Sequence, residues 1–513
     1  MAEAALILNG QALRFQEVEA VARHARPVRI GEEARKRMEI ARAVVQGLTD
    51  GGKKGGAPAV YGVNTGFGSL SRVQIPIDQV REVQRNLIRS HAAGVGEPLP
   101  DEVVRAMLLL LASSLSRGHS GVRPEVALLI ENVLNQGITP IVPSRGSVGA
   151  SGDLAPLAHA GLTLIGEGLA RLRTGETVTS AVALQRARLS PLALEAKEGL
   201  AIINGTHLMA ALGALALCDV ERLIDAAIGS AAMAIDACRA TDAFLDDRLH
   251  KARNQPGQRS VAERLRKLLK SSSIVKAHKE NDPRVQDPYC LRATPQVLGA
   301  AADAITFVQS VFENELGAVT DNPLVFPGKS SDATIVSGGN FHGMPLAIAL
   351  DALKIALCHI AGIAERRIFW LLAASDSENP VNIYLSPQPG LHSGLMIVQY
   401  AAAACCNELQ TLAHPASVHN IPTSAGIEDY NSMGATAALQ ARAAVELATN
   451  VIACELLVMA EAMEYQRPLK SGAGVEKVYR SVRAVVPRLT EDRPPSPDIA
   501  ALAKIIREGA LSR

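Results

Sequence analysis

The chain has 513 residues, of which 48% are hydrophobic and 20% are charged, so it can bury a core and is not a disordered protein. Its 52 lysines and arginines nearly balance its 51 aspartates and glutamates, which argues against a polycation that binds nucleic acid or membrane surfaces. Only 8 Phe, 7 Tyr and 1 Trp are present, so we expect a core of aliphatic side chains on closely packed helices.

The N-terminal part is expected to combine a short hairpin with amphipathic helices. Residues 6–8 and 12–13 are apolar and flank Asn9-Gly10, a dipeptide typical of a two-residue turn, which predicts the hairpin. Apolar side chains then recur at helical spacing in three segments, 78–92, 101–117 and 124–136.

The later part is expected to be a bundle of long helices. Small and aliphatic residues recur every three and four positions over 207–240, 294–318, 343–374 and 432–463. Helices this long and apolar must be buried on several sides, in part between subunits. The sequence therefore predicts a mainly α fold, with residues 1–200 as a smaller N-terminal domain and 201–513 as the long-helix bundle and C-terminal helical region.

Cysteine usage and hydropathy favour a soluble, cytoplasmic protein without a membrane partner. The 7 cysteines are an odd number without a C-x-x-C pair, which is typical of reduced thiols. The N-terminus has no basic segment ahead of a long apolar run, so we expect no signal peptide. No window reaches the ~18 uncharged apolar residues that a spanning helix needs. We expect no metal site either, because H-E-x-x-H is absent and His414 and His419 are not at i, i+4 spacing.

The segment Gly146–Leu154 contains residues with unusual chemical potential. It matches neither the Gly-rich nucleotide-binding motifs nor G-x-S-x-G, and its plain interpretation is a Gly-rich helix entry with Asp153 as the cap. In Ala150-Ser151-Gly152, however, the amide nitrogen of Gly152 could attack the carbonyl carbon of Ala150. Loss of one water from that ring, and of the Ser151 hydroxyl as a second, would leave an exocyclic methylidene. Such an electrophile suits the expulsion of an amine from an amino acid.

Eight separated motifs cover nearly the whole chain: Tyr61–Gly68, Ser90–Gly96, Gly149–Leu157, Ile203–Thr206, Gln286–Arg292, Asp321–Pro323, Gly339–His342 and Glu428-Asp429. In this order they resemble the aromatic amino acid ammonia-lyases that carry a methylidene-imidazolone (MIO) group, and among these the histidine branch. The resemblance implies the long-helix architecture of the fumarase/aspartase superfamily, an MIO made from Ala150, Ser151 and Gly152 without an external cofactor, and a homotetramer whose active sites are each built from three subunits.

The resemblance also assigns roles to side chains that otherwise read as packing or paired surface residues. Tyr61 matches the base that takes the β-proton, and because a phenol has a reference pKa of ~10, we expect positive charge or helix N-termini to lower it. Arg292 would hold the substrate carboxylate in a forked pair.

Four further side chains complete the implied site. Asn204 and Gln286 offer amides that could fix the prosthetic ring and Tyr289, or that could simply cap loops. Tyr289 would be a second active-site phenol that assists the cofactor or proton movement. Phe341 would pack on the ring or the substrate, and an ordinary core role is the alternative.

His91 and Glu428 bear on the choice of substrate, because the resemblance places them at the substrate side chain. A histidine beside a carboxylate can hydrogen-bond both nitrogens of an imidazole, whereas a phenyl ring would leave the glutamate buried and unpaired. They therefore favour deamination of L-histidine to trans-urocanate and ammonia. Ile427 and Tyr430 stand where the histidine branch has an amide and a histidine. A phenylalanine or tyrosine ammonia-lyase, or an aminomutase of the same family, is thus the alternative.

Two other classes of protein fit less well. A fumarase-like helical lyase would carry a G-S-S-x-M-P loop, which this sequence lacks. A non-catalytic helical scaffold would have no need for Ala150-Ser151-Gly152 together with Tyr61 and Arg292.

Overall fold

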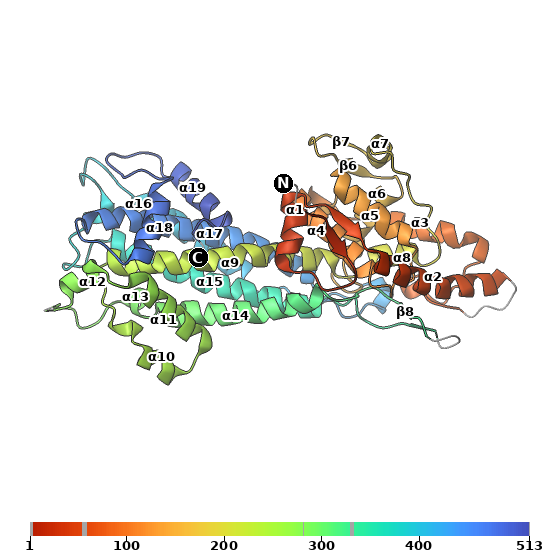
Figure 1. Ribbon diagram of the computed structural model, residues 1–513, viewed down its shortest axis with the longest axis horizontal. Coiled ribbons are helices and arrows are strands. Elements are labelled where there is room, and N and C mark those ends of the chain that lie inside the picture. The colour runs from red at the N-terminus through yellow and green to blue at the C-terminus, as the bar shows by residue number, and fades with distance from the viewer. Residues whose placement is uncertain (1–3, 54–58, 281, 329–332, 512–513) are drawn as a thin grey trace. The chain divides into compact units, whose positions relative to one another are not determined.

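Helices make up most of the computed structural model, which describes residues 4–53, 59–280, 282–328 and 333–511 (Figure 1). The predicted mainly α fold is therefore confirmed. The chain divides into two units. Unit 1 comprises Met1–Leu215, Gln309–Leu350 and Pro415–Leu439, and unit 2 comprises Ala216–Val308, Asp351–His414 and Gln440–Arg513. Unit 1 thus runs past residue 200 to Leu215 and takes in two later segments, while the assignment of 1–200 and 201–513 as domains stays a prediction.

Unit 1 contains short strands among its helices. Its helices are α1 (Phe15–His24), α2 (Glu32–Lys53), α3 (Val80–His91), α4 (Asp101–Leu115), α5 (Pro124–Gln136), α6 (Leu154–Leu164), α7 (Ser180–Arg186) and α8 (Glu198–Ile203). Its strands are β1 (Leu6–Leu8), β2 (Val28–Ile30), β3 (Val95–Pro98), β4 (Thr139–Pro140), β5 (Pro143–Arg145), β6 (Leu169–Arg171), β7 (Thr177–Thr179), β8 (Leu324–Phe326) and β9 (Thr334–Val336). The antiparallel sheets are β3-β5, β4-β6-β7 and β8-β9.

Four long helices contribute residues to both units, because the division falls inside each of them: α9 (His207–Ala237), α14 (Thr294–Glu315), α15 (Met344–Leu372) and α17 (Gly434–Tyr465). Unit 2 adds α10 (Asp247–Arg253), α11 (Pro256–Leu269), α12 (Ser273–His278), α13 (Tyr289–Arg292), α16 (Met396–Leu412), α18 (Ala473–Arg483) and α19 (Ser496–Arg507). All seven helical segments expected from apolar periodicity are present, with ends that differ by a few residues. Periodicity identifies them well because a buried face must recur with the helical period.

The predicted N-terminal hairpin is wrong. Strand β1 pairs in parallel with β2, with Leu6 opposite Val28 and Leu8 opposite Ile30, and α1 connects the two strands. These four side chains are at most 4% exposed. Pairing with β2 gives β1 a partner with the same alternating buried pattern, so burial of apolar side chains outweighs the local turn preference of Asn9-Gly10.

Two helices, α15 and α17, are long and apolar enough to cross a membrane, contrary to the expectation that no segment would be. The most apolar windows of these helices are 61% and 78% buried inside the protein, and core helices of soluble proteins pass the same test. Both helices also carry buried charge, since Arg367 of α15 pairs with Glu455 of α17 and neither side chain is exposed. Their composition is therefore weak evidence for a membrane span.

Close packing between α9 and α14 gives a test of the core of unit 1. A Cβ atom added at Gly213 would lie 2.0 Å from a ring carbon of the fully buried Phe312, whereas one added at the exposed Gly47 of α2 would meet nothing within 4 Å. We expect Gly213→Ala to lower the free energy of unfolding by about 1–3 kcal/mol through overpacking. Gly47→Ala should raise it by about 0.5–1 kcal/mol through helix propensity. Denaturant unfolding followed by circular dichroism measures both, and an unchanged midpoint for Gly213→Ala would contradict the packing.

Candidate active site

Most of the predicted site residues line two adjoining pockets of unit 1. The His91 pocket, of about 480 Å³, is lined by Tyr61, His91, Ser151, Asn204 and Glu428 among others. The Phe341 pocket, of about 600 Å³, is lined by Tyr61, Ala150, Ser151, Asn204, Phe341 and Glu428 among others. Four candidate side chains belong to both linings, so the two pockets are parts of one cleft centred on Ser151.

The Ala150-Ser151-Gly152 loop lies between β5 and α6 and packs tightly against residues 204–206. Gly152 has φ +75° and forms a bridge with Gly205, and a Cβ atom at position 152 would lie 2.2 Å from the Gly205 carbonyl oxygen. Only glycine therefore fits there. The next residue, Asp153, donates its amide hydrogen to the same Gly205 carbonyl at 2.7 Å.

The surroundings of this tripeptide fit an MIO group. A ring closed between Gly152 N and Ala150 C would retain the Ser151 carbonyl as its only carbonyl, and Asn204 Nδ2 donates to that oxygen at 2.8 Å. Asn204 itself is only 3% exposed, so this hydrogen bond is shielded from water. Ala150 is also buried, at 4% exposed.

Asp153 caps a different helix from the one expected. It precedes α6, but its side chain does not cap that helix. Instead, Oδ2 accepts hydrogen bonds from the amides of Leu208 and Met209 in the first turn of α9, at 2.9 and 3.0 Å, and Oδ1 accepts one from Ser147 at 2.8 Å. Burial raises the pKa of Asp153 to about 6. The sequence could not reveal this partner, which lies more than fifty residues away along the chain.

The N-termini of α15 and α17 also meet this loop. The amide of Gly343, just before α15, donates to the Gly149 carbonyl, and the amide of Met433, just before α17, donates to the Val148 carbonyl at 2.9 Å. The Ser432 hydroxyl adds a second hydrogen bond to Gly149 at 2.9 Å. Together with α6 and α9, four helices therefore begin around the loop, and their dipoles make its surroundings electropositive.

Burial controls the protonation of the two candidate acid–base side chains. It lowers the pKa of His91, which is therefore neutral near pH 7, and His91 Nδ1 lies 2.9 Å from the Leu87 carbonyl. A hydrogen on Nδ1 satisfies that carbonyl and leaves Nε2 as an acceptor. Burial raises the pKa of Tyr61, assisted by the charge of Glu428, although the amide of Gly68 donates to its phenol oxygen. The expectation that surroundings of Tyr61 lower its pKa is thus wrong for this chain, because burial outweighs that hydrogen bond.

Glu428 contacts the Ala150-Ser151-Gly152 loop directly. Its Oε1 accepts a hydrogen bond from the Ser151 hydroxyl at 2.8 Å, and its Oε2 accepts one from the Thr423 hydroxyl at 3.1 Å. Thr423 was not predicted from the sequence, and no motif singles it out. The Phe341 pocket is also lined by His342, whose Nε2 lies 2.9 Å from the Tyr430 carbonyl, and by Asn322 of the Asp321-Asn322-Pro323 motif.

Gln286, Tyr289 and Arg292 belong to unit 2, where they form a group of their own. The Arg292 guanidinium lies 4.4 Å from the centroid of the Tyr289 ring, a cation–π contact. Tyr289 is 72% exposed and Gln286 is also exposed.

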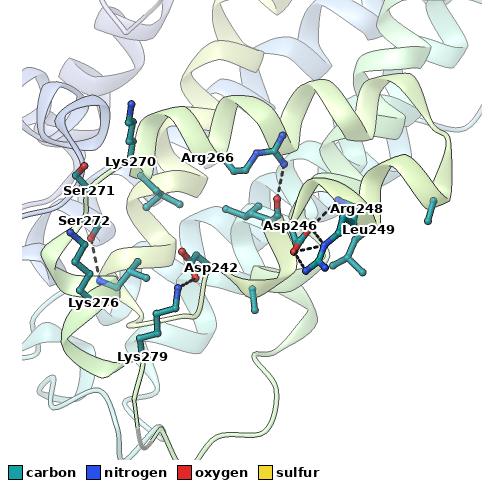
Figure 2. A pocket seen from close by; sticks show the side chains of 15 residues that line it. Asp242, Asp246, Arg248, Leu249, Arg266, Lys270, Ser271, Ser272, Lys276 and Lys279 are labelled. Carbon is teal, nitrogen blue, oxygen red and sulfur yellow. Dashed lines mark hydrogen bonds and ion pairs between the residues drawn. The ribbon is translucent and has the colours of Figure 1, made fainter.

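Unit 2 also has a pocket of about 930 Å³ that none of the predicted site residues lines (Figure 2). Much of its charge is internally compensated, since Arg248 pairs with Asp246 at 2.6 Å and Lys279 with Asp242 at 3.5 Å. Among the described residues, no cluster of three or more His, Cys, Asp or Glu side chains could hold a metal ion.

Comparisons with known proteins agree in family. The family model described as Aromatic amino acid lyase matches residues 13–484. A histidine ammonia-lyase of Sorangium cellulosum is 47% identical over 509 residues, which cover 98% of each chain. The crystal structure of histidine ammonia-lyase from Trypanosoma cruzi has a TM-score of 0.90 at 38% identity and covers 99% of this chain and 94% of that one. A tyrosine aminomutase from Streptomyces globisporus has a TM-score of 0.91 at 33% identity, with 99% and 98% covered. The chain therefore belongs to the aromatic amino acid lyase family.

Proposed function

We propose that this protein is a histidine ammonia-lyase, which converts L-histidine into trans-urocanate and ammonia without an external cofactor. One observation carries the proposal: Ser151 of the Ala150-Ser151-Gly152 loop lies between Asn204 and Glu428, in a cleft that His91 and Tyr61 also line. The relatives named histidine ammonia-lyase, which match over nearly the whole chain, support the same substrate.

The reaction has to expel a poor leaving group, the amine. An MIO formed from Ala150, Ser151 and Gly152 would supply an electron-poor alkene that activates this amine. The chain's own contribution is electrostatic. Asn204 donates to the Ser151 carbonyl, and the four helix N-termini around the loop favour negative charge there.

The reaction must also remove a weakly acidic β-proton, and we assign this step to the Tyr61 oxygen. The phenol has to lose its own proton first, and the Gly68 amide stabilises the resulting phenolate through its hydrogen bond. Beside it, His91 Nε2 and the Glu428 carboxylate offer two acceptors; a neutral imidazole, with its one N–H, can donate to one of them, and an imidazolium can donate to both. These two acceptors would orient the substrate side chain.

We further propose a cytoplasmic homotetramer with shared active sites, in which Gln286, Tyr289 and Arg292 enter each site from another copy of the chain. In support, Val285 is 94% exposed and Tyr289 is 72% exposed, so this segment presents apolar and aromatic surface that a partner subunit could cover. Arg292 would then bind the substrate carboxylate, and Tyr289 and Gln286 would flank it. None of the seven cysteines forms a disulfide bond, which suits a reducing compartment.

The second candidate is a tyrosine or phenylalanine lyase or aminomutase. It is favoured by Ile427 and Tyr430, which line the Phe341 pocket and offer apolar and aromatic surface to a phenyl or phenol ring. Incubation with L-histidine, L-phenylalanine and L-tyrosine separately distinguishes the two candidates by the absorbance of the conjugated acid or by the appearance of a β-amino acid.

Intact-mass measurement tests the prosthetic group. We expect the purified protein to weigh two waters less than its sequence, and Ser151→Ala to lack the two-water deficit, because it has no hydroxyl to lose and can shed at most the water of ring closure. Histidine turnover of that variant should fall by orders of magnitude while the protein remains folded. Ser144→Ala, in the neighbouring β5, is the control and should keep the deficit. A wild-type chain of full sequence mass would refute the proposal.

Substitution of Glu428 tests whether this residue recognises the side chain of the substrate. Glu428→Gln keeps the shape of the side chain but removes its charge, so histidine should lose a charge-assisted hydrogen bond that a phenyl ring never makes. We expect kcat/KM for L-histidine to fall roughly 10- to 100-fold more than any residual kcat/KM for L-phenylalanine. Equal losses would mean that Glu428 acts on the chemistry or on the Ser151 loop rather than on substrate choice.

The raised pKa of Tyr61 predicts an alkaline pH dependence. Because the pKa lies above the ordinary phenol value of 10, the reactive phenolate is a minor form near neutrality and grows as pH rises. We expect kcat/KM to increase between about pH 7 and pH 9. His91, whose pKa is lowered, is already neutral over this range and should not contribute. A flat or falling profile would exclude Tyr61 as the base, and Tyr61→Phe should abolish the rise.

A further inference from the structure

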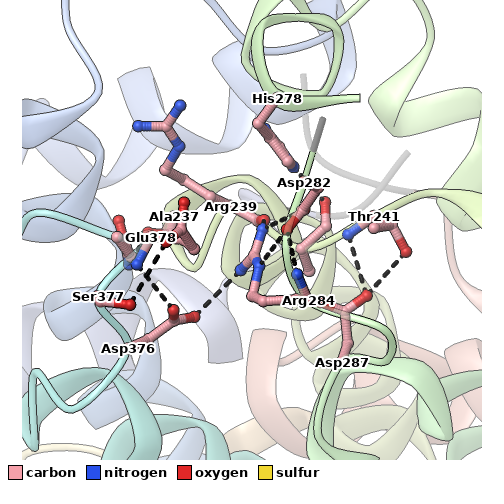
Figure 3. Close-up of polar contacts among 12 residues, drawn as sticks. Ala237, Arg239, Thr241, His278, Asp282, Arg284, Asp287, Asp376, Ser377 and Glu378 are labelled. Atoms are coloured by element: carbon pink, nitrogen blue, oxygen red, sulfur yellow. Dashed lines mark hydrogen bonds and ion pairs between the residues drawn. The ribbon is translucent and has the colours of Figure 1, made fainter. Parts of the chain in front are cut away.

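The residues that precede α13 are fixed to the rest of unit 2 by a network of partly buried charges (Figure 3). In this 282–292 segment, Arg284 binds both oxygens of Asp282, with distances of 2.7 Å from Nη2 and 3.0 Å from Nε. It also binds Asp376 at 3.1 Å and the main-chain oxygen of Arg239. The hydrogen bond from Arg284 lowers the pKa of Asp282 to about 2, so the pair is ionised at any physiological pH.

A second anchor in the 282–292 segment is Asp287, which is only 5% exposed although its neighbour Gln286 is exposed. Its Oδ2 accepts two hydrogen bonds from Thr241, one from the amide at 3.0 Å and one from the hydroxyl at 2.8 Å. Its Oδ1 is buried and finds no hydrogen-bond partner among the described residues. Burial of a carboxylate with one oxygen unsatisfied is costly, so fold stability alone gives little reason for this side chain.

The main chain of Asp287 in turn holds Arg292. Arg292 Nε donates to the Asp287 carbonyl at 2.9 Å, while the guanidinium lies over the Tyr289 ring. This hydrogen bond uses Nε, the inner nitrogen of the guanidinium, and does not involve the two terminal nitrogens, Nη1 and Nη2. Those terminal nitrogens form the fork that binds a carboxylate.

The far end of α13 is fixed as well. Arg367 Nη1 donates to the Thr294 hydroxyl at 3.2 Å and to the Cys290 carbonyl at 3.4 Å, and Arg367 pairs with the equally buried Glu455. The main chain is therefore held on both sides of α13. The Arg292 side chain is oriented by its hydrogen bond to the Asp287 carbonyl, so the position of that carbonyl determines where the guanidinium lies.

We propose that Asp287 is a positioning residue for substrate binding: its bond to Thr241 fixes the carbonyl that orients Arg292 toward the carboxylate of the amino acid. This inference rests on the proposed function, in which Arg292 binds that carboxylate. It adds a residue that does not touch the substrate and acts through Arg292.

The test compares Asp287→Ala with Asp246→Ala in the same unit. Asp246 also accepts a main-chain amide, from Arg248 at 2.9 Å, so each variant loses one hydrogen bond of this kind. We expect Asp287→Ala to lower kcat/KM for L-histidine about 10- to 100-fold, mainly through KM. Asp246→Ala should leave KM unchanged.

Asp287→Asn keeps an oxygen toward Thr241 and should recover most of the loss. If Asp287→Ala fails to fold, Thr241→Val is used instead and should raise KM more modestly.

Two readouts separate positioning from a merely structural role. Inhibition by histamine, which has the imidazole and the amine but no carboxylate, should be the same for wild type and Asp287→Ala. In an Arg292→Ala background, adding Asp287→Ala should cost less than about threefold in kcat/KM, because both changes remove the same interaction. Weaker histamine binding, or additive losses in the double variant, would overturn the proposal.

Failure of the proposed function gives a different pattern. If the wild-type enzyme forms no urocanate, the histidine assignment is wrong. The role of Asp287 is then tested by the same two measurements: KM for the amino acid that the enzyme does deaminate, and inhibition by the amine that lacks the carboxylate of that amino acid. An unchanged KM in Asp287→Ala, alongside an active wild type, contradicts only the positioning role.

Discussion

The convergence of helix N-termini on the loop that contains Ser151 organises unit 1. The first turns of α9, α15 and α17 leave amide hydrogens without partners inside their helices, and such groups must be satisfied elsewhere. In this chain, the side chain of Asp153 and the carbonyls of Val148 and Gly149 satisfy amides at or just before these helix starts. The same contacts hold the loop in place and put it in a positive field, which is the setting that the proposed MIO group would need.

Burial sets the acid–base state of the cleft. His91 is kept neutral with Nδ1 toward a backbone carbonyl, and Tyr61 is kept protonated more strongly than a free phenol. Glu428 is coupled to both, because its charge acts on each of their pKa values. A ligand that fills the cleft therefore meets a neutral imidazole, a phenol and a carboxylate at close quarters, a combination that recognises N–H groups and can accept a proton.

Unit 2 follows a different principle, in which ion pairs fix one exposed turn. The Arg367–Glu455 pair is fully buried and the Arg284–Asp282 pair is partly buried. Such pairs contribute little net stability, because desolvation of the charges offsets their attraction. Their effect is to hold the main chain in one arrangement, and here the arrangement determines where Arg292 and Tyr289 lie.

The amino-acid sequence alone determined the features that depend on local order. Helical periodicity identified α9, α14, α15 and α17, because burial of one face leaves a repeating pattern wherever the helix runs. The proposal that Ala150-Ser151-Gly152 forms a ring could likewise be made from the sequence, since the three groups that would react are neighbours in the chain. Tertiary structure decided what depends on distant partners: β1 pairs with β2 rather than folding back, and Asp153 caps α9 rather than α6. It also raised rather than lowered the pKa of Tyr61, because a pKa follows burial and neighbouring charge, which no local pattern records.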